Sequence, residues 1–123
     1  MLRGMSDLKQ LDDELNQMIA TGRGFPDGFD KFYADDVVMV EAAGEECKGK
    51  EANRRREIEF LGSIAEFHGV NLVASAVGDG VSFSEWEFDL TFVGGGSRVK
   101  MQQVARRRWK DGKVVHERFY YNA

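Results

Sequence analysis

The sequence contains few of the residues that build disulfide frameworks or metal sites. Its 123 residues include one cysteine, one proline and two histidines. Because Cys47 stands alone, no internal disulfide can form, which is typical of a reducing compartment, and we expect a cytoplasmic protein. The histidines, His68 and His116, are too far apart to form a ligand cluster, so we expect neither a metal nor another cofactor.

Long apolar runs and charge of one sign are also missing. No run approaches the roughly 20 apolar residues that span a bilayer, and the first residues lack the apolar core of a secretory signal. We therefore expect no membrane partner. The 17 basic and 21 acidic residues give a net charge of −4. The arginine runs 54–56 and 106–108 are too short to track a phosphate backbone, so we expect no nucleic-acid partner.

The composition is that of one globular domain. Apolar residues make up 42% of the chain and charged residues 31%, a balance typical of folded rather than disordered chains. We expect a single domain over residues 1–123. In its first half, apolar side chains recur at three- and four-residue steps and form inward stripes, with Leu8, Leu11 and Leu15 in the first helix and Ile58 and Leu61 in the third. This spacing predicts helices over residues 7–21, 26–33 and 50–65, with a strand over 36–41 and a loop over 43–49.

The second half of the chain changes to the alternating pattern of strands. We expect strands over residues 67–77, 81–93, 98–110 and 113–122. Glycine-bearing turns separate them, and the last turn, Asp111-Gly112, is a strong hairpin signal. Three consecutive hairpins make an antiparallel sheet, and helices from the first half must cover one face of it. The predicted fold class is α+β.

Alternation also predicts which side chains share the inner face of the sheet. Trp86, Phe88 and Leu90 lie on one face of their strand, and acidic residues lie on the other. If the next strand pairs in the matching phase, its inward side chains are Met101, Gln103, Ala105, Arg107 and Trp109.

The phase of the last strand has two solutions. A two-residue turn pairs Trp109 with Val114 and would place His116, Arg118 and Tyr120 on the inward face. A longer turn or a bulge would instead turn the other set inward: Val115, Glu117, Phe119 and Tyr121. We favour the first phase.

Two blocks of the sequence resemble a known superfamily. Residues 32–41, followed by Gly44 and residues 48–52, are similar to the signature of the nuclear-transport-factor-2-like superfamily. Residues 109–115 and 117–121 resemble the end of its SnoaL-like domains. This resemblance implies a cone-shaped barrel, in which three helices from the N-terminal half cover the concave face of a curved antiparallel sheet. It also implies one pocket for a small, apolar or carbonyl-containing ligand.

The resemblance further implies a base position. Ketosteroid isomerase, a member of the superfamily, has its general-base aspartate six residues beyond the first aspartate of an Ala-Asp-Asp motif. The same count from Asp35 reaches Glu41. The two oxyanion donors of that enzyme correspond to Ala105 and to a position near Leu15, which are not donors. SnoaL-like cyclases carry an acid/base aspartate on the last strand, where this sequence has His116 and Arg118.

Two hypotheses about function follow from these residues. The first is an acid/base enzyme of isomerase, cyclase or dehydratase type that acts on a small, partly apolar carbonyl compound. In it Glu41 removes the proton, His116 assists, and Arg118 or Gln103 holds the oxygen. The second is a non-catalytic ligand-binding or dimerisation module of the same fold. The expected pocket-lining residues are Tyr33, Phe60, Trp86, Met101, Gln103, Trp109 and Tyr120.

The outer face of the sheet is expected to join two subunits, as it commonly does in domains of this kind. It would carry charges of both signs, which can be self-complementary across a two-fold axis. We therefore expect a homodimer whose interface includes Glu85, Glu87, Asp89, Lys100, Arg106 and Arg108.

Overall fold

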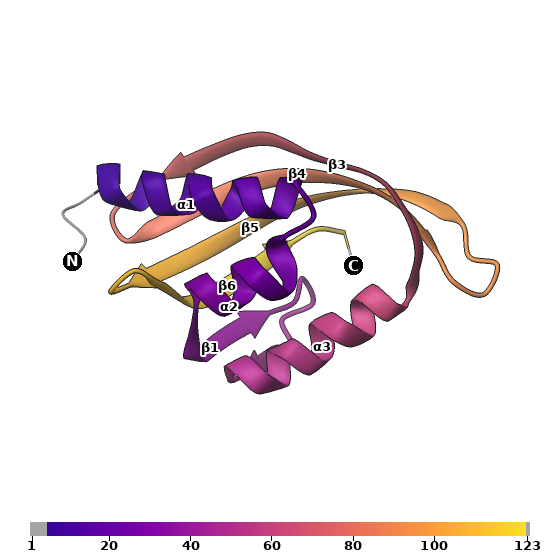
Figure 1. The fold of residues 1–123 in the computed structure, drawn as a ribbon, viewed down its shortest axis with the longest axis horizontal. Coiled ribbons are helices and arrows are strands. Elements are labelled where there is room, and N and C mark those ends of the chain that lie inside the picture. The colour runs from indigo at the N-terminus through magenta and orange to yellow at the C-terminus, as the bar shows by residue number, and fades with distance from the viewer. Residues whose placement is uncertain (1–4, 123) are drawn as a thin grey trace.

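Helices from the first half of the chain cover one face of a curved sheet in the computed structural model, which describes residues 5–122 and the side chains from residue 7 onward (Figure 1). The helices are α1 (Met5–Ala20), α2 (Phe29–Phe32) and α3 (Lys50–Gly62), and the single turn η1 (Gly24–Gly28) leads into α2. The strands are β1 (Tyr33–Val40), β2 (Glu46–Lys48), β3 (Ile64–Val77), β4 (Val81–Phe92), β5 (Arg98–Lys110) and β6 (Lys113–Tyr120). The predicted α+β class is confirmed.

The described strands form one sheet in the order β2-β1-β6-β5-β4-β3. The hairpins expected from β3 to β6 are present, and β1 joins the sheet parallel to β6. The loop expected over residues 43–49 contains β2, which pairs antiparallel with β1. An open strand edge leaves a row of unpaired backbone groups, and β2 satisfies those of β1.

The last hairpin follows the first predicted phase for only a few residues. Asp111 and Gly112 both have positive φ, 51° and 77°, as the expected two-residue turn requires. Trp109 pairs with Val114, but the register then shifts, so that Arg108 pairs with His116. Val115 is the extra residue of this bulge, and one extra residue exchanges the two faces of a strand.

The bulge corrects the predicted orientation of the last strand. His116 and Arg118 lie opposite Arg108 and Arg106 on the outer face, and Tyr120 is 43% exposed. Beyond Val115 the strand follows the second predicted phase, in which Glu117 faces inward. Glu117 is buried opposite Arg107. The physical reason is charge: Arg107 faces inward, and Glu117 neutralises it, whereas Arg118 at that place would add a second buried cation.

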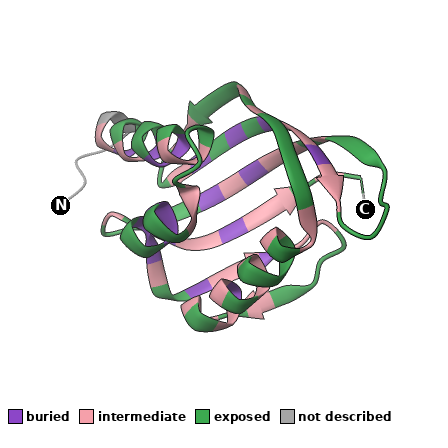
Figure 2. Ribbon diagram, turned by 45° about the vertical axis from the view of Figure 1, so that its right-hand side comes forward, coloured by how far each residue is buried: buried purple, intermediate pink, exposed green. Residues whose placement is uncertain are grey.

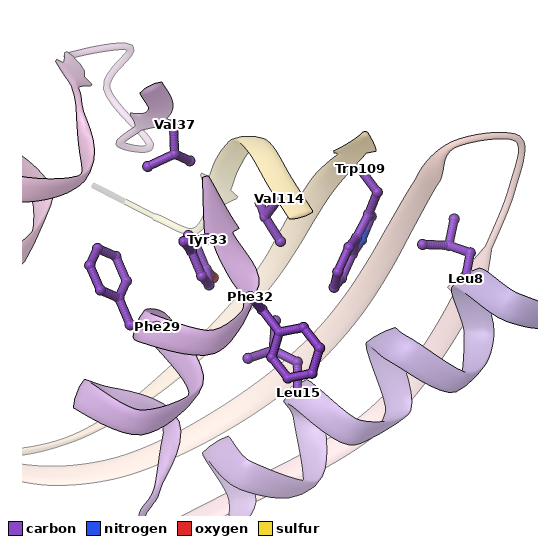
Figure 3. Packing of buried hydrophobic residues seen from close by; sticks show 8 residues of the cluster. All are labelled: Leu8, Leu15, Phe29, Phe32, Tyr33, Val37, Trp109 and Val114. Atoms are coloured by element: carbon purple, nitrogen blue, oxygen red, sulfur yellow. The ribbon is translucent and has the colours of Figure 1, made fainter. Parts of the chain in front are cut away.

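An apolar core lies where α1 and α2 pack on β1, β5 and β6. Leu8 and Leu15 come from the predicted stripe of α1, and Phe29 and Phe32 come from α2 and point into the same cluster (Figure 3). Trp109, expected to line a pocket, is instead part of this core, with its ring edge-on to Phe32 at 6.0 Å. The eight buried residues of the cluster are Leu8, Leu15, Phe29, Phe32, Tyr33, Val37, Trp109 and Val114.

Helix α3 differs most from its prediction. It ends at Gly62, so residues 64 and 65 belong to β3, and Ile58, expected on the inward stripe, is 55% exposed. The buried residue of α3 is Asn53, whose amide donates to the backbone oxygens of Cys47 (3.0 Å) and Gly49 (2.8 Å). These two hydrogen bonds hold the start of α3 against the segment that leads into it. Exposed and half-buried residues are interspersed along the rest of α3 (Figure 2). None of the described helices is long and apolar enough to cross a membrane.

A buried ion-pair network connects α1 to the sheet. Arg107 is 1% exposed. Its Nε donates to Glu117 Oε2 at 2.8 Å, and its Nη1 donates to Asp12 Oδ1 at 2.8 Å. Burial alone would lower the pKa of Arg107, but the Tyr33 hydroxyl, Glu117 and Asp12 outweigh it and raise that pKa. The guanidinium is therefore charged, and it holds β5, β6 and α1 together.

Neutral side chains add further hydrogen bonds to the two carboxylates of this network. The Tyr33 hydroxyl donates to Glu117 Oε1 at 2.6 Å, and the Ser82 hydroxyl donates to Asp12 Oδ1 at 2.7 Å. Trp109 Nε1 in turn donates to Ser82 Oγ at 2.9 Å. A buried ion pair is tolerated when such hydrogen bonds complete it.

Neighbouring arginines on β5 give a matched test of the network. Arg107→Met leaves Asp12 and Glu117 buried without their cation and should lower the free energy of unfolding by about 3–5 kcal/mol. Arg108→Met changes an exposed side chain of the same strand and should alter it by no more than about 0.5 kcal/mol. Urea melts of both variants check this, and equal costs would contradict the structure.

Candidate functional site

A cavity of about 1010 Å³ lies between the helices and the inner face of the sheet. This volume is at the upper end of the roughly 300–1,000 Å³ typical of small-molecule sites. The wall is largely apolar, with aromatic rings from η1, α2, β4 and β6. Polar side chains interrupt it at Tyr33, Glu41, Asn53, Arg56, Glu57, Glu59, His68, Gln103, Arg107, Glu117 and Tyr121.

Glu57 is the cavity's most perturbed carboxyl group. It lies one helical turn beyond the buried Asn53 and so on the same face of α3. The side chain is half-buried and lines the cavity. Burial first, and then the negative charges of Glu117 and Glu41, raise its pKa from an ordinary 4.5 to about 7. Near neutral pH, Glu57 therefore populates both its protonated and its ionised form.

Glu41 is held by two neighbours in an arrangement that we call the Glu41 cluster (Glu41, Arg56 and Tyr121). Arg56 Nη2 forms an ion pair with Glu41 Oε1, and the Tyr121 hydroxyl donates to Glu41 Oε2 at 2.7 Å. Glu41 directly follows β1 and Tyr121 directly follows β6, its parallel neighbour, which brings the two together. Burial and the hydrogen bond to Glu41 raise the pKa of Tyr121 to about 12.

Glu117 brings the buried ion-pair network to the cavity wall. Tyr33, Arg107 and Glu117 all line the cavity. Burial, followed by the charge of Glu117, raises the pKa of Tyr33 well above its ordinary value. The Tyr33 hydroxyl is thus protonated at neutral pH and donates to Glu117.

The cavity brings together six of the residues singled out from the sequence. Glu41 and five of the expected lining residues border it: Tyr33, Phe60, Trp86, Met101 and Gln103. Their part in any chemistry stays a prediction.

Four other residues of the sequence prediction do not line the cavity. Trp109 lies in the apolar core, and Tyr120 points outward. His116 and Arg118 lie on the outer face because of the bulge. There burial, followed by Arg106 and Arg108, lowers the pKa of His116. The expected convergence of Glu41 with His116 is therefore wrong.

Sequence reasoning missed Glu57. It sought an apolar stripe along residues 50–65, and the inward face of α3 is instead largely polar. A signal was present in the spacing of Asn53, Glu57 and Phe60 at four- and three-residue steps, which marks one helix face. Only the packing of α3 shows that this polar face, and not the face of Ile58, meets the cavity.

The acidic groups of the cavity do not form a metal site. Within residues 5–122, no three His, Cys, Asp or Glu side chains are grouped as metal ligands would be. Glu41 and Glu117 are each engaged by an arginine. What the site offers chemically is a carboxyl group that exchanges protons near pH 7 in apolar surroundings.

Solved structures share this architecture. A provisional SnoaL-like polyketide cyclase from Mesorhizobium loti is 27% identical, with a TM-score of 0.81 over 93% of this chain and 98% of that one. A second protein so described, from Jannaschia, is 13% identical, with a TM-score of 0.79 over 92% and 86%. A ketosteroid-isomerase-like protein from Catenulispora acidiphila, in complex with trimethylamine, is 17% identical, with a TM-score of 0.74 over 89% and 85%.

The family follows from a sequence match as well as from the fold. No curated protein matches the chain, and the two more distant structures show the fold alone. Residues 7–121, however, match the SnoaL-like domain family. Since the match spans nearly the whole chain, the protein belongs to the SnoaL-like domain family.

Proposed function

We propose that the protein is an acid/base enzyme that moves a proton within a small, largely apolar carbonyl compound, with Glu57 as the group that carries the proton. The observation that carries this proposal is the position of Glu57 in the wall of a large apolar cavity. Its pKa of about 7 supports the role, because proton transfer is most efficient when the pKa of the catalytic group lies near the working pH.

The proposed step starts with ionised Glu57. Its carboxylate removes a proton from the carbon next to the carbonyl group, and the electron pair of the broken C–H bond moves toward the carbonyl oxygen. Glu57, now protonated, returns the proton to another carbon or to an oxygen of the same molecule. Return of the proton to another carbon completes an isomerisation. In a cyclisation the enolate carbon instead attacks a second carbonyl carbon of the same molecule, and the oxygen of that carbonyl takes the proton. In a dehydration the enolate electrons expel a β-hydroxyl group, which takes the proton and leaves as water. None of these steps needs an oxidant or a second substrate.

Gln103 is the proposed donor to the carbonyl oxygen. Negative charge that develops on this oxygen must be met by hydrogen-bond donors. Gln103 lines the cavity and pairs across the sheet with Trp86. Its amide is not taken up by another side chain among residues 5–122, so it is available to a ligand.

Glu41, the base position implied by ketosteroid isomerase, is less suited to this role. Both of its carboxylate oxygens are already engaged, one by Arg56 and one by the Tyr121 hydroxyl. A base must approach the proton that it removes within hydrogen-bond distance, and each partner already takes one lone pair of the oxygen that it contacts. Glu57 makes no such contacts among the described residues.

We also propose that the outer face of the sheet joins two copies of the chain. Arg106 Nε, Arg118 Nε and His116 Nδ1 are buried there without a hydrogen-bond partner among the described residues. Glu85 and Glu87 are exposed on the same face. Carboxylates of a second copy would pair with the guanidinium groups of Arg106 and Arg118, which form no ion pair among the described residues.

Proton exchange into ketones tests the proposed reaction. In D2O, a panel of small aryl and alkyl ketones that bind the protein should lose their α-proton NMR signals faster in its presence. Glu57→Gln should slow this exchange by about 10²–10⁴-fold, and Gln103→Leu by about 10²–10³-fold. Ligand-observed NMR checks that both variants still bind. Binding without any exchange would identify the alternative, a non-catalytic ligand-binding module.

The pH dependence of stability tests the titration of Glu57 without a substrate. Between pH 4.5 and 7 the folded state holds the Glu57 proton and the unfolded state does not, so this group lowers stability as pH rises. Glu57→Gln cannot ionise and should gain roughly 1–3 kcal/mol on the wild type across that window. Urea melts at a series of pH values check this. Exposed Glu59, changed to Gln, is the control and should gain nothing.

Salt tests the proposed dimer. Because exposed ion pairs are screened, the dimer dissociation constant should rise at least several-fold between low salt and 1 M NaCl. Light scattering at micromolar protein measures it. A monomer in low salt would end the proposal.

A further inference from the structure

Three segments of the chain meet in the Glu41 cluster. Arg56 reaches Glu41 from α3, and Tyr121 reaches it from the end of β6. The side chains of Arg56 and Glu41 are 36% and 30% exposed, so the pair lies partly open to water, while both residues also line the cavity. An ion pair this exposed adds little stability. A structural role alone therefore gives a weak account of it.

Arg56 is the immediate neighbour of Glu57 on α3, and both residues line the same cavity. A free guanidinium on a long side chain beside a half-buried carboxyl would attract its ionised form. In the structure Arg56 instead points to Glu41, and Glu41 itself repels a negative charge on Glu57. Glu41 thus acts on Glu57 in two ways, by pairing with Arg56 and by its own negative charge, and both raise the pKa of Glu57.

We propose that Glu41 is a positioning residue that holds the Arg56 guanidinium away from Glu57 and thereby sets the protonation of the carboxyl group that works in the cavity. This inference rests on the proposed function of Glu57. Glu41, which corresponds to the base position of ketosteroid isomerase, would then act through Arg56 and not on a substrate.

Other charged groups face Glu57 and set the background for this effect. Glu117, from β6, is the carboxylate with the largest effect on it, ahead of Glu41, and Arg56 acts in the opposite direction. The remaining titratable groups of the cavity wall are Tyr33, Glu59, His68, Arg107 and Tyr121. Arg107 is already shared between Glu117 and Asp12. Arg56 is therefore the arginine of the cavity wall whose ion-pair partner can change from Glu41 to Glu57.

Two substitutions should move the Glu57 titration in opposite directions. Glu41→Gln removes the ion-pair partner of Arg56, whose remaining contact is a hydrogen bond to Cys47, and it also removes a repelling charge. The pKa of Glu57 should therefore fall from about 7 toward its ordinary 4.5. Arg56→Gln removes the attracting charge and leaves Glu41 unpaired, so that pKa should rise. Carbon-13 NMR of glutamate-labelled protein measures both. In each variant the ratio of protonated to ionised Glu57 at pH 7 should change at least several-fold.

A matched control separates positioning from general electrostatics. Glu45→Gln removes an exposed carboxylate from the loop beside Arg56 but leaves the Glu41–Arg56 pair in place, and it should barely move the titration of Glu57. The pH–rate profile of α-proton exchange should shift with the NMR value in the Glu41 and Arg56 variants.

The Glu57 titrations test the positioning role of Glu41, and the ketone exchange tests the proposed reaction. No shift of the Glu57 titration in folded Glu41→Gln, or a shift of the same sign in both variants, would overturn it. If Glu41→Gln fails to fold, the rise expected in Arg56→Gln still decides. Opposite shifts without any exchange of ketone protons would support the positioning role of Glu41 and refute the proposed reaction.

Discussion

The buried guanidinium of Arg107 is the constraint on which the rest of the structure depends. Its two carboxylate partners come from opposite ends of the chain, Asp12 on α1 and Glu117 on β6. A cation at this depth is stable only when such partners surround it. The requirement fixes the register of β6, the approach of α1 to the sheet, and the placement of Glu117 in the cavity wall.

That register decides which chemistry the cavity can hold. Because Glu117 faces inward, a negative charge lies close to Glu57 and raises its pKa. The same bulge turns His116 to the outer face, where it meets arginines and no ligand. Because β6 has one extra residue, Glu117 lines the cavity where His116 was expected. Of the four glutamates that line the cavity, Glu41 and Glu117 are paired with arginines and Glu59 is exposed, whereas Glu57 is half-buried and free to titrate.

Membership of the SnoaL-like family does not by itself identify the catalytic group. The fold of this chain encloses a large cavity, and one fold can serve unrelated reactions. The position that carries the base in ketosteroid isomerase holds an acid here as well, Glu41, but its environment differs because Arg56 and Tyr121 engage both oxygens. What matters for proton transfer is which carboxyl group is desolvated and unpaired, and that is Glu57 on α3.

The sequence by itself determined the elements that depend on local chemistry. Leucine spacing gave α1, the Asp111-Gly112 turn gave the last hairpin, and alternation gave the inward faces of β4 and β5, Trp86 and Gln103 included. Only the tertiary structure decided the phase of β6 and the buried face of α3. A bulge has no local signature in the residues around Val115, since it is selected by the pairing of Arg107 with Glu117, ten residues apart. The polar face of α3 is likewise chosen by distant partners: Asn53 is fixed by backbone oxygens before the helix, and Glu57 titrates near pH 7 because Glu117 and apolar walls from other strands surround it.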